Sequence, residues 1–562
     1  MKKRIAIGVS DFREMLTGAY YYVDKTLFIK DVLEDGSKVI LLPRPRRFGK
    51  TLNMSMLTYF FEKSAIDNSA LFENLAISQH SDCMDKQGQY PVIYLTFKDL
   101  KHNTWEVTYD SLVEVIYKEY NRHLYLLDSP VLNEMDKIYF NRVRLDQGSE
   151  ADYTSSIRNL AELLSKHNGK KTIILIDEYD VPIQQAYLKK YYDQLISFLR
   201  NFMTAALKDN NYLEKAVLTG VMRVARESLF SGLNNLSVQT LLNRSYSKHF
   251  GFIETEVEEL LNYYGIESQL EEVRNWYNGY IFGNTVVYNP WSVLQYTQNW
   301  EEGLQPYWVN TSDNEIVHRL ISRGGPALKM ELEDLLQGTP VVKTINQNIS
   351  MGEVEKNDQN VWSFLLFSGY LKPLSRDIID GEMICSLAIP NREVQTIYRD
   401  IVKSWFNDTV HSDFLRTMLK SLTSGQIEVF ASHFKEYVQS SFSYFDTGGK
   451  VPEKIYHAFV LGLLVGLRPN YEIKSNREGG YGRYDVMVIP QDTSQAGIII
   501  EFKSVEPEEV KDLEQAAQQA LQQIEAKGYQ QELFERGIHK IIKLGIVFRG
   551  KEVLVKARDS RA

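Results

Sequence analysis

Short runs of β-branched and aliphatic residues alternate with longer amphipathic stretches over the first 250 residues. The runs at 39–42, 92–97, 172–176 and 216–219 are predicted strands, and the stretches at 51–62 and 155–165 are predicted helices between them. Strands that alternate with helices in this way form parallel sheets covered by helices on both faces. The pattern therefore predicts a doubly wound α/β domain over residues 1–250.

The pattern changes after residue 250. It predicts short helices at 256–264, 271–276 and 291–296 and a further helix at 362–370. Two strands, at 371–374 and 383–388, would lie on either side of an Asp380-Gly381 turn. We therefore expect a helical lid and a winged-helix-like region at 251–390. The helical pattern that follows predicts a connector at 391–445.

A second α/β pattern begins near residue 446. It predicts a helix at 453–467, followed by strands at 471–474, 485–489 and 497–502. A helix at 507–526 and a strand at 541–548 would follow. Pro507 suits the first turn of its helix, because the N–H that it lacks has no acceptor there. Residues 446–562 are therefore expected to form a separate α/β domain.

Length and composition restrict the class of protein further. The 562 residues suffice for more than one core and exclude a single small module. Cys83 and Cys385 give no disulfide framework or metal-binding pair. The longest apolar run, 458–467, is shorter than the about 20 residues of a membrane helix. We expect a cytoplasmic protein without a membrane partner, in which the net charge of −9 requires a local basic surface for any nucleic acid.

The segment 41–51 carries the clearest motif of the first half, since it follows a predicted strand and opens a predicted helix. Such a loop places backbone N–H groups and a helix N-terminus against phosphate groups. Gly49 would shape the turn, Lys50 would reach the β- and γ-phosphates, and the Thr51 hydroxyl would bind Mg²⁺. A solvated basic turn is the alternative interpretation.

The phosphate loop departs from the G-x-x-x-x-G-K-[ST] pattern at its first position. Arg44 stands where the first glycine would be, and an arginine adopts a left-handed turn less readily than glycine does. The entrance of the loop must therefore differ. We expect Arg44, Arg46 and Arg47 to add cationic contacts to phosphate.

A buried strand ends in two carboxylates, Asp177 and Glu178, about 125 residues after the loop. At that place Asp177 would hold Mg²⁺, and Glu178 would polarise the attacking water. The next strand ends at Thr219 and is followed by Arg223 and Arg226, which suit sensing of the γ-phosphate. A strand followed by an acidic turn, with arginines on the surface, is the alternative.

Six segments together make the chain similar to a known family: Tyr21-Tyr-Val-Asp-Lys-Thr26, Pro43-Arg-Pro-Arg-Arg-Phe-Gly-Lys-Thr51, Leu175-Ile-Asp-Glu-Tyr-Asp180, Thr219-Gly-Val-Met-Arg-Val-Ala-Arg-Glu-Ser228, Trp276-Tyr-Asn-Gly-Tyr280 and Tyr288-Asn-Pro-Trp-Ser292. The set resembles the bacterial AAA-ATPase-like family, whose members commonly carry a C-terminal PD-(D/E)XK nuclease-like domain. The resemblance covers essentially the whole chain. It implies an ATP-binding P-loop NTPase module beside a nuclease-type fold.

The predicted C-terminal domain, residues 446–562, carries a carboxylate–lysine pattern of its own. Asp485 begins one predicted strand, and Glu501 and Lys503 end the next, so antiparallel pairing would bring the three together. Alternation along a strand places Glu501 and Lys503 on one face, about 7 Å apart. Two carboxylates bind Mg²⁺, and a lysine positions and helps to deprotonate the attacking water. A salt pair at an exposed strand edge is the alternative.

The order of residues and elements in this region also resembles the PD-(D/E)XK nucleases. That resemblance implies that Glu453, on the preceding helix, completes the metal site and that Gln523 and Tyr529 flank it. For Gln523 and Tyr529, ordinary helix surface is the alternative, and for His457, one turn after Glu453, it is the preferred interpretation.

The sequence therefore predicts an ATP-binding and ATP-hydrolysing protein with a Mg²⁺-dependent nuclease-type domain that acts on nucleic acid, expected to be DNA. A homo-oligomer is compatible with this class of ATPase. The alternative is a nucleotide-dependent switch or scaffold, whose nuclease-like domain only binds nucleic acid or a protein. A metabolic P-loop kinase is disfavoured, because no motif for a second substrate is present.

Overall fold

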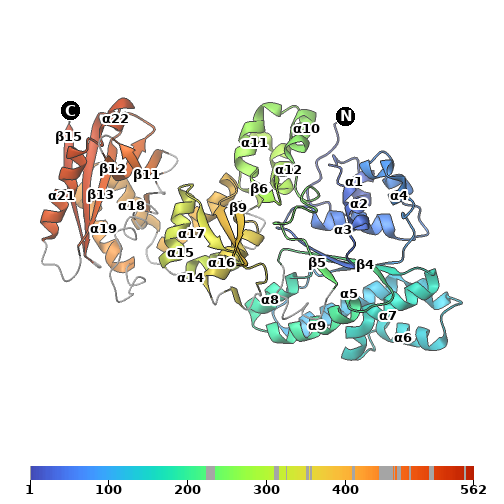
Figure 1. The fold of residues 1–562 in the computed structure, drawn as a ribbon. Helices are drawn as coiled ribbons and strands as arrows, with labels where there is room; N and C mark the ends of the chain where they lie inside the picture. Colours follow the sequence, from blue (N-terminus) through green and yellow to red (C-terminus); the bar gives the residue numbers. More distant parts are fainter. Residues whose placement is uncertain are drawn as a thin grey trace. The chain divides into compact units, whose positions relative to one another are not determined.

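The computed structural model describes residues 2–222, 235–308, 315–323, 326–349, 353–354, 357–407, 412–441, 460, 463–464, 467, 470–479, 482–505, 512–549 and 552–561. The chain divides into two compact units, and Figure 1 shows the helices and strands of each. Unit 1 comprises residues 1–320 and 338–395, and unit 2 comprises residues 321–337 and 396–562. Among the described residues, no helix has the length and apolar character that a membrane crossing requires.

A five-stranded parallel sheet forms the centre of unit 1. Its spatial order is β2-β3-β4-β1-β5. The strands are β1 (Val39–Pro43), β2 (Val92–Thr96), β3 (Thr172–Asp177), β4 (Leu213–Gly220) and β5 (Leu236–Val238). The four predicted strands are confirmed, and every residue of β1 and β3 is buried, as expected for strands covered on both faces. β5 is too short to give a periodic signal.

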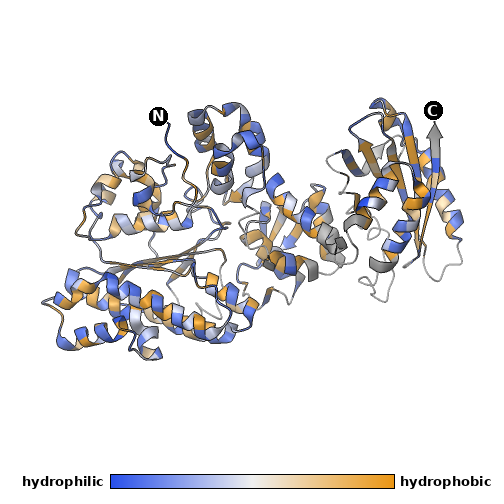
Figure 2. Ribbon diagram, turned by 180° about the vertical axis from the view of Figure 1, so that it is seen from behind, coloured by the Kyte–Doolittle hydropathy of each residue, from blue (hydrophilic) through white to orange (hydrophobic). Residues whose placement is uncertain are grey.

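Helices cover both faces of this sheet (Figure 1). On one face lie α1 (Phe12–Thr17), α2 (Leu27–Glu34) and α3 (Lys50–Phe61), and on the other α5 (Trp105–Arg122), α7 (Glu150–Asn168) and α9 (Tyr192–Leu207). The helices α4 (Ser81–Met84), α6 (Glu134–Arg144) and α8 (Val181–Lys189) lie between them along the chain. Figure 2 shows hydrophobic strands between helices with alternating hydrophobic and hydrophilic bands. The predicted doubly wound fold is confirmed.

The rest of unit 1 combines short helices with two small antiparallel sheets. The helices are α10 (Glu254–Tyr264), α11 (Leu270–Tyr277), α12 (Pro290–Gln298) and α16 (Asp358–Phe367), and α14 (Glu315–Arg323) extends past the boundary of the unit. The strands β6 (Tyr280–Phe282) and β7 (Thr285–Val287) form a hairpin, and β8 (Val341–Thr344), β9 (Lys372–Ile379) and β10 (Glu382–Ala388) form the sheet β8-β10-β9. The predicted helix followed by a hairpin around Asp380-Gly381 is present.

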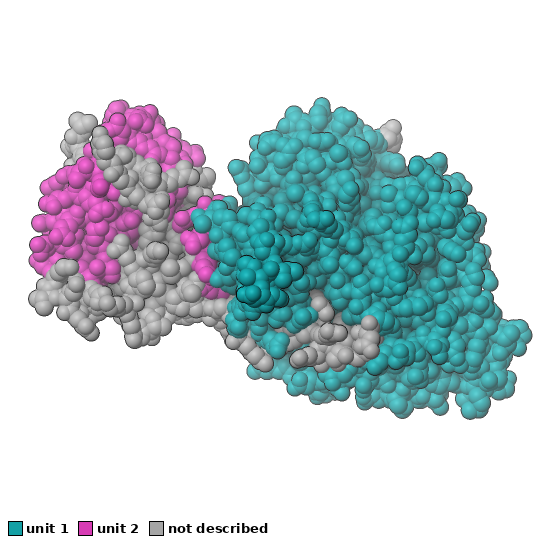
Figure 3. Space-filling view, in the orientation of Figure 1, with its two compact units in different colours: residues 1–320, 338–395 teal, residues 321–337, 396–562 magenta. Residues whose placement is uncertain are grey.

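Unit 2, whose described residues are magenta in Figure 3, contains a five-stranded mixed sheet. Its strands are β11 (Tyr471–Gly479), β12 (Gly482–Pro490), β13 (Gly497–Ser504), β14 (Lys540–Arg549) and β15 (Glu552–Arg561). Only β13 and β14 are parallel. Its described helices include α15 (Pro326–Leu336), α18 (Ser412–Thr423), α19 (Ile427–Ser441), α21 (Leu513–Ala526) and α22 (Gln531–Glu535), and α17 (Arg392–Asn407) begins in unit 1.

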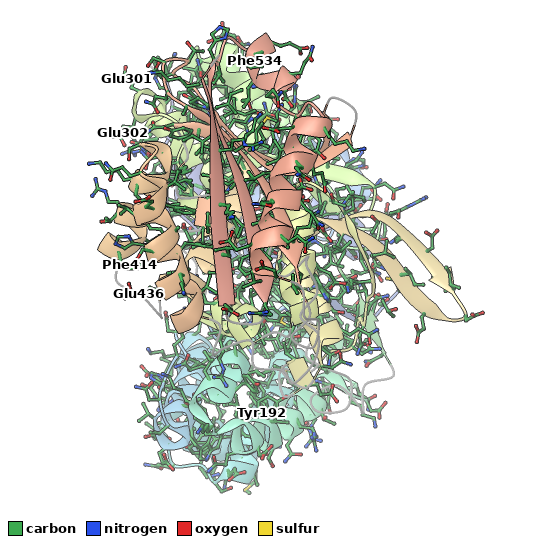
Figure 4. All side chains as sticks on the ribbon, turned by 90° about the vertical axis from the view of Figure 1, so that its left-hand side faces the viewer. Tyr192, Glu301, Glu302, Phe414, Glu436 and Phe534 are labelled. Atoms are coloured by element: carbon green, nitrogen blue, oxygen red, sulfur yellow. The ribbon has the colours of Figure 1, made fainter. Side chains whose placement is uncertain are left out.

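The two faces of the second sheet have different helical covers. Val486, Ile498 and Ile500 belong to one core with residues of α18 and α19, whereas Met487 and Ile499 belong to another with residues of α21. In Figure 4, α21 lies along the sheet, and the labelled Phe414 and Glu436 mark α18 and α19 on the other side. Because strand residues alternate between faces, residues 485, 501 and 503 lie on the face covered by α21.

Candidate functional sites

The phosphate loop joins the buried strand β1 to α3. Gly49 precedes the first residue of α3 and has a φ of +83°, in the left-handed region that favours glycine. An added Cβ there would meet nothing within 4 Å, so the requirement for glycine is conformational. The predicted elements on both sides of the loop are therefore present, and Thr51 lies in the first turn of α3, where it is partly buried.

Lys50 is held inside this loop. Its side chain is buried, and its ammonium group donates hydrogen bonds to the carbonyl oxygens of Arg44 (3.0 Å) and Pro45 (2.9 Å). Burial lowers the pKa of Lys50, and the nearby carboxylates of Glu178 and Asp177 oppose this shift. The loop is thus wrapped around a buried cation, which argues against a solvated basic turn.

The ends of β3 and β4 bring polar groups together opposite the loop. Asp177 is fully buried, and the hydroxyl of Thr219 donates a hydrogen bond to its Oδ1. Its Oδ2 has no hydrogen-bond partner among the described residues. Because β4 lies between β1 and β3, Thr219 stands between the loop and the acidic strand. A buried carboxylate oxygen without a donor is suited to a cation ligand.

Glu178 follows Asp177 in an unusual backbone conformation. Its φ is +53°, a left-handed value that costs free energy for a residue with a Cβ. Burial raises the pKa of Glu178, Lys50 opposes that shift, and the charge of Asp177 reinforces it. A carboxylate with a raised pKa next to a buried acid is a candidate for proton transfer.

Asp180, to which the motif pattern assigned no role, fixes the backbone at the end of β4. Its Oδ2 accepts hydrogen bonds from the backbone N–H groups of Val221 and Met222 and from the Gln184 amide, each at 2.9 Å. A Cβ on Gly220 would lie 2.6 Å from Asp180 Oδ1, so glycine is required for this close approach. The only sequence signal was a third acid within the same short motif.

The three arginines of the loop have separate environments. The expectation that Arg44 contacts phosphate is wrong: its side chain is fully buried over the rings of Phe250 and Phe282, and it donates to the carbonyl of Gln239 at 2.6 Å. Burial lowers the pKa of Arg44 to about 9. As the continuation of β1, Arg44 points into the core instead of the loop.

Arg46 and Arg47 lie beside other polar and aromatic groups. Arg46 donates a hydrogen bond to the side-chain oxygen of Gln184 at 3.2 Å, and the Arg47 guanidinium lies 4.3 Å from the centre of the Trp291 ring. Both remain candidates for phosphate contacts. The predicted Arg223 and Arg226 lie outside the described residues.

In unit 2, the predicted antiparallel pairing of the two charged strands is present. Val486 of β12 pairs with Ile500 of β13, so Asp485 is placed opposite Glu501. The carboxylate of Asp485 also accepts a hydrogen bond from the backbone N–H of Phe502 at 2.7 Å. The local pairing therefore brings the two acids to adjacent positions on the face covered by α21.

Asp485, Glu501, Lys503, Gln523 and Tyr529 form a C-terminal cluster, and Glu501 lies at its centre. It is 2% exposed, its Oε1 lies 3.5 Å from Lys503 Nζ, and the Gln523 amide donates a hydrogen bond to the same oxygen. Burial raises the pKa of Tyr529, and the charges of Glu501 and Asp485 raise it further, while a hydrogen bond with Gln523 opposes the shift. Gln523 and Tyr529 are therefore part of the cluster and not of the helix surface.

Gly545 allows α21 to come close enough to the sheet for the hydrogen bond between Gln523 and Glu501. It pairs with Glu501 across β13 and β14, and a Cβ added to it would lie 2.7 Å from the carbonyl oxygen of Ala517. A larger residue would push α21, which carries Gln523, away from the sheet. The sequence pattern gave no signal for this approach.

The third predicted acid, Glu453, and the neighbouring His457 lie outside the described residues. Within the part of the chain that the structure describes, no group of three or more His, Cys, Asp and Glu side chains is arranged to hold a metal ion. The described part of the C-terminal cluster thus contains two carboxylates, one lysine, one amide and one phenol.

These features define a P-loop type of α/β domain followed by a nuclease-like domain. Residues 6–230 match the family described as predicted AAA-ATPase, and residues 451–558 match the PD-(D/E)XK nuclease superfamily. The chain therefore carries an AAA-ATPase-like domain and a C-terminal domain of the PD-(D/E)XK nuclease superfamily, as the resemblance implied. It is also 26% identical over 577 residues to a protein of Azotobacter chroococcum mcd 1, described as an uncharacterized protein in the vnfD 5' region, with 100% of this chain and 98% of that protein covered.

Proposed function

We propose that this protein binds and hydrolyses ATP with Mg²⁺ in its AAA-ATPase-like domain. The observation that supports this is the buried Lys50, wrapped by the loop and facing Asp177 and Glu178. Lys50 would hold the phosphate oxygens, and Glu178 would accept a proton from the attacking water. When bound, Mg²⁺ would neutralise phosphate charge, with Thr51 and Asp177 as its protein ligands.

The other residues of this site would bind the phosphate groups. Backbone N–H groups around Gly49 would face the β-phosphate, and Arg46 and Arg47 would approach from the entrance of the loop. Thr219, already bonded to Asp177, would sense the γ-phosphate together with Arg223.

In the C-terminal domain, we propose Mg²⁺-dependent hydrolysis of phosphodiester bonds in nucleic acid, with DNA as the substrate. The observation that carries this proposal is the convergence of Asp485, Glu501 and Lys503 on one face of the sheet. The two acids, with Glu453, would hold the metal. Lys503 would orient the attacking water at its ammonium group, and Gln523 would fix the Glu501 carboxylate.

Plasmid cleavage tests the nuclease part. With Mg²⁺, the wild-type protein should nick or linearise supercoiled DNA, and Lys503→Ala should reduce the rate at least about 100-fold. Lys540→Ala, which removes an exposed lysine from β14 of the same sheet, is the matched control and should cleave like wild type. Wild-type protein that leaves DNA intact with and without ATP would contradict the proposal.

Binding of labelled ATP tests the nucleotide part. Lys50→Ala should lose affinity, whereas Lys63→Ala, which removes an exposed lysine just beyond the other end of α3, should not. Equal affinities of wild type and Lys50→Ala would show that the loop does not hold phosphate.

A second candidate function is a nucleotide-dependent switch or scaffold in a cytoplasmic homo-oligomer. The observation that favours it is the buried Arg44, which ties the entrance of the loop to Gln239 and two aromatic rings. ATP binding without turnover, together with DNA binding without cleavage, would support it.

We also propose that the domains divide near residues 250, 390 and 445.

A further inference from the structure

A buried carboxyl group outside both sites joins two separate segments of unit 1. Glu393, near the start of α17, is fully buried. The hydroxyl of Ser292 lies 2.9 and 2.8 Å from its two carboxylate oxygens, and the backbone N–H of Trp308 donates to Oε1 at 2.7 Å. Glu393 therefore fixes the first turn of α12 and the segment at residue 308 relative to each other.

Each of these two segments brings a tryptophan to the phosphate loop. Trp291, directly before Ser292, lies with its ring 4.3 Å from the guanidinium carbon of Arg47. The indole N–H of Trp308 donates a hydrogen bond to the carbonyl oxygen of Arg46 at 3.1 Å. One carboxyl group thus holds both aromatic contacts on consecutive residues of the loop.

The phosphate loop needs support at the peptide unit between Arg46 and Arg47. Arg47 has a φ of +68°, which is unfavourable for a residue with a Cβ and persists only where the surroundings hold it. The Arg46 carbonyl belongs to the same peptide unit as the Arg47 N–H. A hydrogen bond from Trp308 to that carbonyl therefore fixes the orientation of the unit, and the Trp291 ring restricts the side chain that follows.

We propose that Glu393 is a positioning residue of the nucleotide site, which acts through Trp291 and Trp308 to keep the 46–47 peptide in its phosphate-binding shape. This inference rests on the proposed ATP binding. It assigns to Glu393 no contact with ATP itself. The property of the Glu393 side chain that matters is its ability to form hydrogen bonds with the Trp308 N–H and the Ser292 hydroxyl at the same time.

Titration with labelled ATP and Mg²⁺ tests this role in the full-length chain. Glu393→Gln should bind within about twofold of wild type, because an amide can accept from the Trp308 N–H and donate to the Ser292 oxygen. Glu393→Ala should bind at least about tenfold more weakly. Trp308→Phe, which keeps a ring but removes the N–H, should bind about three- to tenfold more weakly. Glu382→Ala, an exposed change in β10, is the control.

The outcomes separate this inference from the proposed function. Wild-type protein that does not bind ATP contradicts the proposed function itself. If wild type binds and Trp308→Phe, with a wild-type circular dichroism spectrum and urea midpoint, binds equally well, the positioning role is wrong. A Glu393→Gln protein as weak as Glu393→Ala would also overturn it, since rescue by the amide is what distinguishes positioning from a need for charge.

Discussion

Replacement of Glu393 by glutamine should remove a specific pH dependence of the stability of unit 1. Burial raises the pKa of Glu393 from 4.5 to about 8, against the opposing effects of the Trp308 N–H and the Ser292 hydroxyl. Its neighbours Tyr277 and Tyr280 have pKa values raised by burial, so both remain neutral. The native state therefore holds Glu393 in its protonated form near neutral pH.

The sign and size of the effect follow from this shift. The native chain retains the proton more strongly than the unfolded chain, so the contribution of Glu393 is complete below pH 4.5 and is lost as the pH rises through about 8. Each pKa unit corresponds to about 1.4 kcal/mol. Between pH 6 and pH 9 the contribution of Glu393 falls by the equivalent of about two pKa units. Wild type should therefore lose about 3 kcal/mol of unfolding free energy relative to Glu393→Gln, which cannot ionise.

Urea unfolding at pH 6 and pH 9, followed by tryptophan fluorescence, measures this difference. Of the seven tryptophans only Trp405 lies outside unit 1, so the signal reports mainly on this unit. Other titrating groups are common to both proteins and cancel in the comparison. Glu382→Gln, on the exposed side of β10, should follow wild type. Equal losses in wild type and Glu393→Gln would refute the reasoning.

Four further predictions concern the two sites. Asp180→Ala leaves two backbone N–H groups after β4 without their acceptor and should lower the free energy of unfolding in urea by about 3–5 kcal/mol; a loss below about 1 kcal/mol would contradict this. Gln523→Ala should slow Mg²⁺-dependent plasmid cleavage about tenfold, with Gln531→Ala as control. Gly545→Leu should destabilise unit 2 by about 2–3 kcal/mol, measured by loss of circular dichroism in urea. Mg²⁺ at about 100 times its dissociation constant should stabilise unit 2 by about 2.7 kcal/mol, an effect that Glu501→Gln should abolish.

The parts of the fold and sites that sequence could predict depend on local periodicity. The runs that became β1 and β3 are uninterrupted and apolar, so their ends, and the polar residues there, could be located. In β12 and β13, alternation placed Glu501 and Lys503 on one face, and antiparallel pairing of neighbouring strands brought Asp485 to them. These features depend only on residues that are near one another in the sequence.

The rest depends on contacts between distant segments. Arg44 was expected at the phosphate groups because of its position in the motif, but its direction is decided by rings at Phe250 and Phe282, about 200 residues away in the sequence. The contact of Trp308 with the loop and the closeness of Gly545 to α21 have no periodic signature either. Local patterns locate residues on elements, but they do not show which elements pack together.

Each acidic cluster contains a titratable group whose pKa is raised by burial and raised further by neighbouring acids. At the nucleotide site, Lys50 and Arg46 act to lower the pKa of Glu178, yet burial and the charges of Asp177 and Asp180 leave it raised. In the C-terminal cluster, the charges of two acids add to burial in raising the pKa of Tyr529. A purely structural ion pair would leave little residual field, because burial of unpaired charge costs free energy. A cation from solution would offset the negative charge of these buried acids, and a divalent ion between such carboxylates and a phosphate group is the arrangement that the proposed function requires.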